Sequence, residues 1–243
     1  MKAHVLLSPL NADELFFSEK TTVVIDVLRA TSSVVTALQN GAREVIPVET
    51  MEFAMKISGG QNILAGERNS AKIEGFDFGN SPLEFTREAT AGKSVIFYTT
   101  NGSKALVRAK FSQNLFVASY LNISAVADKL IELNEDFVIL CAGDNGMFSL
   151  EDTLCAGKLI EIIDSKTSGL ELTDAAKASL KLNTVCGKDI LATLKETEHG
   201  RELLEAGFEK DLEFISQIDF TDIVPFLESG AIKIKLKEED KAD

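Results

Sequence analysis

The 243-residue sequence is poor in cysteine, proline and basic residues, and these shortages exclude several classes of protein. Its three cysteines form no C-x-x-C pair, so neither a disulfide framework nor a zinc knuckle is indicated. With 25 basic against 38 acidic residues, the chain lacks the positive surface that sequence-independent binding of nucleic acid requires. No stretch approaches the roughly 20 apolar residues of a membrane span. We therefore expect a soluble protein in the reducing cytoplasm.

The sequence is instead rich in apolar runs that alternate with segments of helical spacing. Hydrophobic residues make up 45% of the chain, which is enough for a large core. Runs of β-branched residues repeatedly precede helical periodicity, a rhythm typical of layered α/β sheets. We expect an α/β/α fold with a largely parallel or mixed sheet, formed by residues 1–243 as one domain or as two intimate α/β lobes. The charge run at 236–243 should be a solvated tail.

The stretch 23–38, VVIDVLRATSSVVTAL, carries the first unusual polar group. Its opening run predicts a strand buried on both faces of a parallel sheet, yet Asp26 lies at the end of that run. A buried carboxylate is costly unless a cation, a cluster of donors or a metal compensates it. Arg29, Thr31 and Ser32 follow, before a helix whose first N–H groups would attract anions. The alternative is an ordinary strand-to-helix junction in which Asp26 caps the helix or pairs with Arg29.

Two later segments repeat this plan of strand, polar turn and helix. The stretch 94–106 places hydroxyl, amide and glycine groups before a helix, as a phosphate or sulfonate cradle requires: Thr100, Asn101 and Gly102. The stretch 137–163 places Glu151 and Asp152 in the first turn of its helix. The polar turns should meet at one edge of the sheet, where the acids would share a cation. The alternatives are a simple Asn-Gly turn and acids that only stabilise the helix dipole.

A long polar segment, residues 66–82, interrupts the alternation. Loops of this length inside a compact domain are usually functional. This one offers two acids, a cation and an amide, namely Glu67, Asp77, Arg68 and Asn80. It also has two phenylalanines, for which a solvent-exposed loop has little need. A surface loop stabilised by its own ion pairs is the alternative.

Taken together, these motifs resemble the 2-phosphosulfolactate phosphatase (ComB) family. The resemblance covers nearly the whole chain and rests on long, ordered motifs: Asp26-Val27-Leu28-Arg29-Ala30-Thr31-Ser32, Gly66-Glu67-Arg68, Gly75-Phe76-Asp77-Phe78-Gly79-Asn80-Ser81-Pro82, Thr99-Thr100-Asn101-Gly102-Ser103, Cys141-Ala142-Gly143 and Glu151-Asp152-Thr153-Leu154-Cys155-Ala156-Gly157. A closing segment is also similar, with His199-Gly200-Arg201, Leu203, Gly207, Asp211 and Val224-Pro225. Two departures, Asn69-Ser70 in place of a glycine and Ser103-Lys104 in place of a Thr-Arg pair, bear on the substrate more than on the reaction class.

The resemblance implies a Mg²⁺-dependent phosphatase that hydrolyses (2R)-2-phospho-3-sulfolactate to 3-sulfolactate and phosphate, a step of coenzyme M biosynthesis. Mg²⁺ is a hard, oxygen-seeking ion, and we expect it to be bound, directly or through water, by Asp26, Glu151 and Asp152. The catalytic candidates are Asp26, Glu67 and Asp77, with one of the last two as general base. The groups expected to hold the anionic substrate are Arg29, Thr31, Ser32, Arg68, Asn80, Thr100, Asn101 and Gly102. His199 is left outside the site, because a surface cap explains it equally well.

The implied partner is therefore a small phospho-sulfo acid, with no nucleic acid and no membrane, and a homo-oligomer is compatible with the sequence. A phosphatase of the haloacid dehalogenase type would also place an aspartate at a strand end. Leu28 stands where that type has its second aspartate, which favours direct attack by water. The remaining alternatives are a phosphatase for another small 2-phospho acid and a non-catalytic organic-anion-binding protein. Clustered acids favour the enzyme, because an anion binder gains nothing from them.

Overall fold

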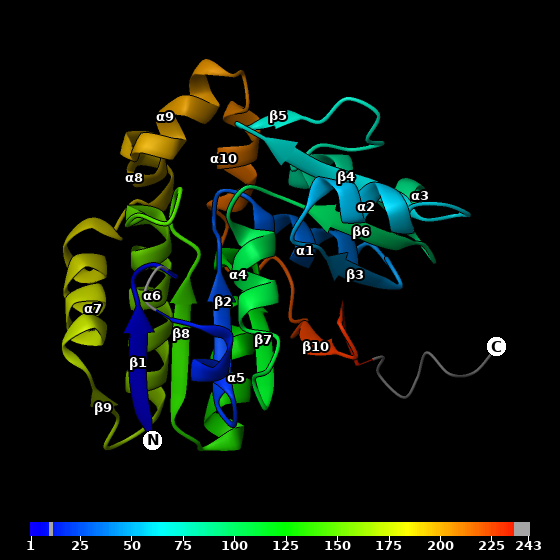
Figure 1. The fold of residues 1–243 in the computed structure, drawn as a ribbon. Helices are drawn as coiled ribbons and strands as arrows, with labels where there is room; N and C mark the ends of the chain where they lie inside the picture. Colours follow the sequence, from blue (N-terminus) through cyan, green and yellow to red (C-terminus); the bar gives the residue numbers. More distant parts are fainter. Residues whose placement is uncertain (10–11, 236–243) are drawn as a thin grey trace.

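The computed structural model describes residues 1–9 and 12–235 as an α/β structure built on one mixed sheet (Figure 1). Its strands are β1 (Lys2–Leu6), β2 (Thr21–Ile25), β3 (Glu44–Pro47), β4 (Ile63–Arg68), β5 (Ala71–Lys72), β6 (Ser94–Tyr98), β7 (Asn114–Ala118), β8 (Phe137–Cys141), β9 (Glu171–Leu172), β10 (Phe226–Glu228) and β11 (Ala231–Lys233). Its α-helices are α1 (Ala30–Gln39), α2 (Met51–Ile57), α3 (Arg87–Thr90), α4 (Gly102–Arg108), α5 (Ile123–Leu133), α6 (Leu150–Lys166), α7 (Asp174–Cys186), α8 (Ile190–Glu196), α9 (Glu198–Glu205) and α10 (Glu209–Ile215). Short 3₁₀ turns are η1 (Glu14–Phe17), η2 (Pro82–Glu84) and η3 (Tyr120–Asn122). The predicted α/β class is confirmed, and the predicted tail at 236–243 lies outside the described residues.

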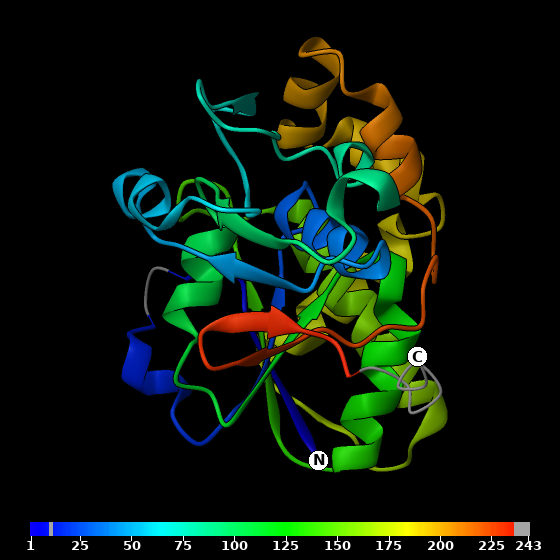
Figure 2. The same ribbon diagram turned by 90° about the vertical axis from the view of Figure 1, so that its right-hand side faces the viewer.

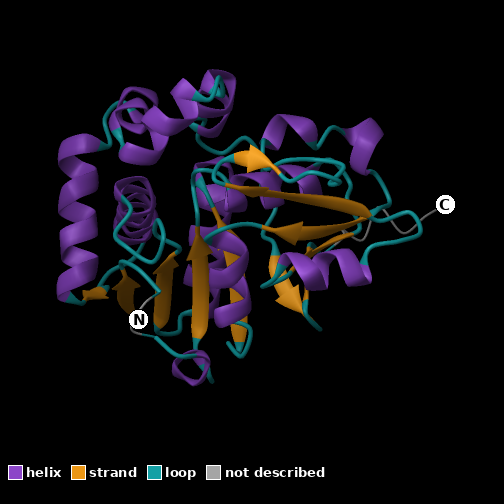
Figure 3. Ribbon diagram, turned by 45° about the horizontal axis from the view of Figure 1, so that its top comes forward, coloured by secondary structure: helices purple, strands orange, loops and turns teal. Residues whose placement is uncertain are grey.

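The sheet consists of two parallel blocks joined by an antiparallel hairpin. Strands β7, β2, β8 and β1 are parallel neighbours in one block, and β3, β6 and β4 are parallel neighbours in the other. The hairpin β10–β11 lies between them, paired antiparallel to β7 and to β3 (Figure 2). Figure 3 shows both groups of strands with helices packed around them. In Figure 1 the arrowheads of β2, β8, β4 and β6 all point toward the region below α9 and α10.

The apolar run predicted as a doubly buried strand is β2, at the centre of the first block. All five of its residues are buried, and it pairs with β7 on one side and β8 on the other. One face of the block packs against α5 and α6, and the other against α1 and α4. The strand-turn-helix units predicted at 94–106 and 137–163 are confirmed as β6–α4 and β8–α6. Asp26 therefore follows a strand that has no exposed face.

The structure differs from the expected loop at 66–82 in its first residues. Strand β4 continues to Arg68 because Gly66 pairs with Tyr98 of β6, where an added Cβ would lie 1.9 Å from the Tyr98 carbonyl oxygen. Phe76 is buried, and Phe78 packs edge-on against Phe85 with ring centroids 5.6 Å apart. The two phenylalanines therefore anchor the rest of the segment to the core, as their presence in a polar loop suggested.

Helix α6 carries the predicted acids and is fixed by close packing against α7. Gly157 of α6 lies directly against the backbone of Ser179 in α7, with no room for a side chain. Ser179 and Asn183 are both buried in this contact.

None of the helices within residues 1–9 and 12–235 is long and apolar enough to cross a membrane.

Gly157→Ala should destabilise the protein, although alanine is the better helix former by about 0.8–1.0 kcal/mol. The added Cβ would lie 2.1 Å from the carbonyl oxygen of Ser179 and 2.8 Å from Cβ of Asn183, so α7 would have to move. Overpacking of this kind costs about 1–3 kcal/mol, and urea denaturation should show that loss in the free energy of unfolding. The control Lys181→Ala, at an exposed position of α7, should stay within about 0.5 kcal/mol of wild type. A Gly157→Ala protein as stable as wild type would contradict this account of the contact.

Candidate active site

Asp26 is held by the turn between β2 and α1. It is 7% exposed, and its Oδ1 accepts a hydrogen bond from the N–H of Ala30 at 3.1 Å. The hydroxyl of Thr31 donates to the Asp26 carbonyl at 2.8 Å and accepts from the Asp26 N–H at 3.0 Å. One carboxylate oxygen of Asp26 therefore accepts a hydrogen bond from the first N–H of α1, as the helix-capping alternative predicts. Thr31, which was predicted to hold substrate, uses its hydroxyl to close this turn.

Glu67 reaches the same region from the end of β4. It is also 7% exposed. Its Oε1 accepts a hydrogen bond from the N–H of Thr100 at 2.7 Å, and its Oε2 accepts from the N–H of Ser70 at 2.9 Å. The carboxylate thus ties the turn after β4 to the turn after β6, and backbone groups fix its position.

Glu151 and Asp152 approach from the first turn of α6. Asp152 accepts hydrogen bonds from the N–H groups of Val27 at 2.8 Å and Gly143 at 3.1 Å, one on each carboxylate oxygen. It therefore ties α6 to the turns that follow β2 and β8. Glu151 is 4% exposed, and its Oε1 lies 4.0 Å from Nδ1 of His199 in α9. The bonding of Asp152 goes beyond stabilisation of a helix dipole, because it joins three elements.

Three of these buried acids, Asp26, Glu151 and Asp152, have pKa values raised mainly by burial. Burial raises the pKa of Asp26 to about 7; His199 opposes this shift, whereas Glu67 and Glu151 add to it. Burial also raises the pKa of Glu151. Burial, with Asp26 and Glu151 contributing, raises the pKa of Asp152 well above its ordinary value. In the described part of the chain no lysine or arginine forms an ion pair with any of these four acids. Such a group is costly to ionise unless a cation joins it.

A small cleft, here called the acid cleft, opens among these groups. Its walls are formed by Asp26, Leu28, Arg29, Glu67, Ser70, Asn80, Thr99, Asn101 and His199. Its volume of about 10 Å³ is roughly what one bound water requires, so a small ion would fill it. Five residues predicted for the site are brought together here from distant segments, namely Asp26, Arg29, Glu67, Asn80 and Asn101.

Asn80 contributes an oxygen without a partner. Its Oδ1 is buried and accepts no hydrogen bond from the described residues. An unsatisfied buried acceptor costs about 1–3 kcal/mol, and amide and carboxylate oxygens are the ligands that a hard cation prefers. The donor set of the acid cleft, with oxygens from Asp26, Glu67 and Asn80, therefore fits Mg²⁺.

The protein alone provides only part of a metal cage. Among the described residues, no three His, Cys, Asp or Glu side chains are arranged to hold a metal ion together. Mg²⁺ commonly uses one or two carboxylates and completes its shell with waters and substrate phosphate, so this arrangement is compatible with it. The ligand set Asp26, Glu151 and Asp152 stays a prediction, and of these three acids only Asp26 lines the acid cleft.

Arg29 links the acid cleft to the C-terminal helices. Its Nη1 donates to Oδ2 of Asp211 in α10 at 2.8 Å, and the two side chains are 2% and 3% exposed. Its Nη2 donates to the carbonyl of Ser70 at 2.9 Å, and its Cζ lies 4.1 Å from the ring centroid of Phe208. The hydroxyl of Ser81 donates to the other oxygen of Asp211 at 2.7 Å. The alternative pairing of Arg29 with Asp26 is not formed, and the guanidinium mainly holds the cleft wall together.

His199 is the wall residue that sequence reasoning left outside the site. Helix α9 brings its ring over the cleft, where Nε2 lies 3.4 Å from the hydroxyl oxygen of Ser70 and Nδ1 faces Glu151. The contacts join residues more than 40 positions apart along the chain, so local spacing gave no signal for them. The resemblance of the closing segment to the family was the only available indication.

Other predicted residues lie outside the cleft walls. Asp77 is exposed, and its Oδ2 accepts a hydrogen bond from the N–H of Leu64 at 2.8 Å, at the start of β4 rather than at its end. Arg68 is exposed. The hydroxyl of Ser32 donates to the carbonyl of Val27 at 2.9 Å and so serves the turn. Their roles in binding or catalysis remain predictions.

Gly102 serves packing at the start of α4. An added Cβ would lie 2.4 Å from Cβ of Ala30 and 2.5 Å from Oδ2 of Asp26. Only glycine allows α4 to approach Asp26 this closely. The residue predicted to bind substrate therefore sets the position of the neighbouring carboxylate.

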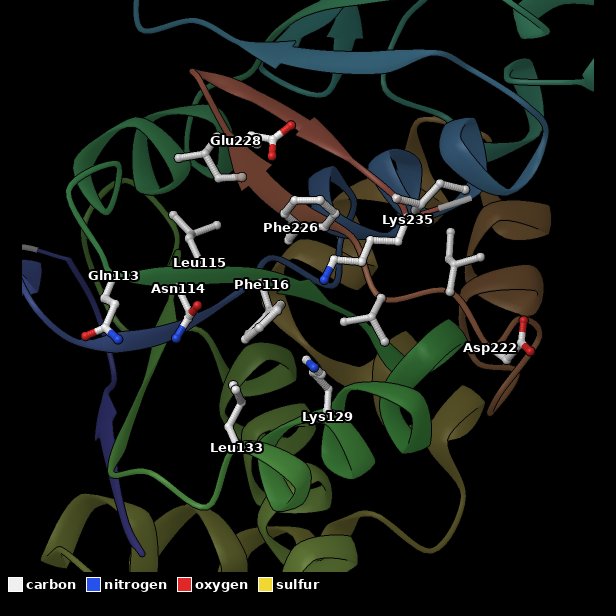
Figure 4. Close-up of a pocket in the computed structure, with 14 residues that line it drawn as sticks. Gln113, Asn114, Leu115, Phe116, Lys129, Leu133, Asp222, Phe226, Glu228 and Lys235 are labelled. Carbon is white, nitrogen blue, oxygen red and sulfur yellow. The ribbon is translucent and has the colours of Figure 1, made fainter. Parts of the chain in front are cut away.

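A larger cavity of about 770 Å³ lies elsewhere, between β7, the β10–β11 hairpin and α5 (Figure 4). Leu115, Phe116 and Phe226 line it, with Lys129 and Glu228 among its polar groups. It adjoins the start of β7, whereas ligand sites of open α/β sheets lie at the carboxyl ends of the strands. None of the predicted site residues lines it. The acid cleft is therefore the better candidate, despite its small volume.

Comparison with known proteins identifies the family. Residues 8–230 match the family described as 2-phosphosulpholactate phosphatase. A probable 2-phosphosulfolactate phosphatase of Clostridium acetobutylicum is 41% identical over 235 residues, which cover 96% of this chain and 100% of the relative. Relatives of the same name from Caldanaerobacter subterraneus and Thermotoga petrophila are 45% and 43% identical, over 88% and 89% of this chain and 90% and 92% of their own lengths. Acids, amides and basic groups gather at the carboxyl ends of the strands. The sequence matches show that the chain belongs to the 2-phosphosulpholactate phosphatase family.

Proposed function

We propose that this protein is a Mg²⁺-dependent phosphatase that hydrolyses (2R)-2-phospho-3-sulfolactate to 3-sulfolactate and phosphate. Its membership of the family supports phosphatase activity on such a substrate. The observation that carries the proposal is the buried group of acids around Asp26, with which no lysine or arginine of the described residues forms an ion pair. Acids in this position would repel a polyanion unless a divalent cation were bound between them. This argues for a metal-dependent hydrolase over an organic-anion-binding protein.

Asp26 and Asn80 are the groups that would hold the ion, and Glu67 would stay available to act on water. When bound, Mg²⁺ would neutralise phosphate charge and act as a Lewis acid toward the phosphoryl oxygens. Glu151 would orient water at the edge of the cleft, and Asp152 would keep the turns after β2 and β8 in register through its two backbone hydrogen bonds. This assignment makes Asp152 a positioning residue rather than a ligand.

The chain's own residues supply the remaining steps. A water oxygen attacks phosphorus, the ester P–O bond breaks, and the alkoxide of sulfolactate takes up a proton. Glu67 is the better base for the water, because it lies in the cleft while Asp77 does not. His199 at the cleft wall is placed to give the proton to the leaving oxygen. Attack by water rather than by Asp26 is favoured, since Asp26 lacks a second aspartate two residues on, where Leu28 stands.

The biological setting belongs to the same proposal. Hydrolysis of 2-phospho-3-sulfolactate would be a step of the coenzyme M biosynthesis type, and a reducing cytoplasm would suit the chain's three free cysteines. Cys141 and Cys155 are buried, and burial raises both thiol pKa values well above their usual range. Thiolate chemistry at these two positions is therefore disfavoured.

Release of inorganic phosphate tests the proposed reaction. We expect the full-length protein with Mg²⁺ to hydrolyse 2-phospho-3-sulfolactate faster than 2-phospholactate, and 4-nitrophenyl phosphate least. Removal of divalent cations with EDTA should abolish release, and added Mg²⁺ should restore it, because the acids would otherwise repel the substrate. If every ester stays intact although one of them binds tightly by calorimetry, the protein is a binder and the proposal is wrong.

Asp26→Asn should separate catalysis from stability. The pKa of Asp26 is raised to about 7 in the folded, metal-free protein. The unfolded chain therefore loses this proton more easily than the folded protein, and the folded state loses stability as the pH rises from about 4 to about 7. At pH 8 without metal, the variant should be more stable than wild type by about 1–3 kcal/mol, and the difference should vanish near pH 4. Phosphate release should fall at least about 100-fold. Thermal unfolding without metal and phosphate assays check both parts; lower stability at pH 8, or near-normal hydrolysis, would remove Asp26 from its assigned role.

A further inference from the structure

A second, basic hollow lies beside the acid cleft. It has a volume of about 240 Å³ and is lined by Thr100, Asn101, Lys104, Arg108, Asn145 and Gly146, among others. We call it the Lys104 hollow. Asn101 lines both spaces and forms the wall between them. Since a water occupies roughly 30 Å³ of liquid, the hollow has room for several non-hydrogen atoms, whereas the acid cleft has not.

The cations of the Lys104 hollow are not neutralised by acids. Lys104 is exposed and forms no ion pair with any residue in 1–9 or 12–235. Arg108 donates to the carbonyl of Pro9, which carries no net charge. By contrast, the guanidinium in the wall of the acid cleft, that of Arg29, is paired with Asp211. Lys104 and Arg108 therefore offer a substrate positive charge beside the acids that no acid of the described residues neutralises.

The neighbouring acid, Asp144, is already bonded to amides. Its Oδ1 accepts hydrogen bonds from Nδ2 of Asn101 at 3.1 Å and from Nδ2 of Asn145 at 3.0 Å. The N–H of Asn145 donates to Oδ1 of Asn101 at 3.0 Å. These bonds hold the turn after β8 against the turn after β6 and direct the carboxylate toward the amides. The result is a fixed wall between the two spaces.

The chemistry of the substrate matches this pair of spaces. In 2-phospho-3-sulfolactate the carboxylate and the phosphate ester are attached to the same carbon, so both lie near the reacting group. The sulfonate is one carbon further away. The sulfonate would need a separate space that contains a cation, because the acid cleft has room for only one small ion. The Lys104 hollow provides both.

We propose that the Lys104 hollow binds the sulfonate of the substrate, with Lys104 as the residue that sets specificity for it. This inference rests on the proposed function and names the subsite that distinguishes a sulfonated ester from its simpler analogues. The phosphate then lies at the mouth of the acid cleft, and Asn101, which lines both spaces, lies beside both anionic groups. Loss of a charged partner of this kind typically weakens binding about 10- to 100-fold.

Lys104→Gln tests the subsite through a comparison of two esters. The value of kcat/KM for 2-phospho-3-sulfolactate should fall about 10- to 100-fold, mainly through KM, while that for 2-phospholactate, which keeps the carboxylate but lacks the sulfonate, should change less than about twofold. Lys104→Arg should restore most of the loss. The control Lys110→Gln removes the same charge just beyond α4, where the lysine pairs with Glu14, and should behave as wild type. Equal losses for both esters, or a Lys104→Gln protein with wild-type kinetics, would overturn the assignment.

Binding of the product separates this inference from the proposed reaction. Calorimetry should show that 3-sulfolactate binds wild type at least about tenfold more tightly than Lys104→Gln, and that lactate does not distinguish them. If wild type hydrolyses neither ester but keeps this difference, the proposed hydrolysis fails and the subsite stands. If both proteins bind 3-sulfolactate equally, the Lys104 hollow is not its site.

Discussion

The structure depends on a group of carboxylates that are buried at the carboxyl ends of the strands and form no ion pair with a lysine or arginine of the described residues. Asp26, Glu67 and Asp152 are not loose side chains, because backbone N–H groups from four turns hold them. The bonds of Glu67 join the turns after β4 and β6, and those of Asp152 join α6 to the turns after β2 and β8. The acids therefore organise the fold locally and at the same time create a site whose charge demands a cation.

Two further features complete the site around this group. The sheet is made of two parallel blocks, and each delivers strand ends and polar turns to the same region. The buried pair of Arg29 and Asp211 attaches the C-terminal helices, so that His199 of α9 reaches the cleft. Removal of one partner alone would leave a buried charge unpaired, which usually costs about 3–5 kcal/mol. Beside the acid cleft, α4 provides positive charge through Lys104 and Arg108.

The sequence predicted those parts of the site that depend on short segments. The run before Asp26 identified a doubly buried strand, and the repeated strand-turn-helix plan placed Asn101 near Asp26, because parallel strands align their carboxyl ends. Local sequence patterns gave no signal for His199, whose partners lie far along the chain. They also did not show that the hydroxyls of Thr31 and Ser32 donate hydrogen bonds to backbone carbonyls of the turn after β2. Asp77 lies outside the acid cleft, because its flanking phenylalanines pack toward the core and its carboxylate accepts a hydrogen bond from Leu64.

The location of a bound divalent cation tests the central claim most directly. Mn²⁺ prefers the same hard oxygen ligands as Mg²⁺ and scatters anomalously, so crystals of the full-length protein grown with Mn²⁺ would show its position. The account predicts one strong anomalous peak in the acid cleft, at about 2.0–2.2 Å from an oxygen of Asp26, with Asn80 as a further ligand. An acid cleft without a peak at saturating Mn²⁺, or an ion bound only at surface acids, would contradict it.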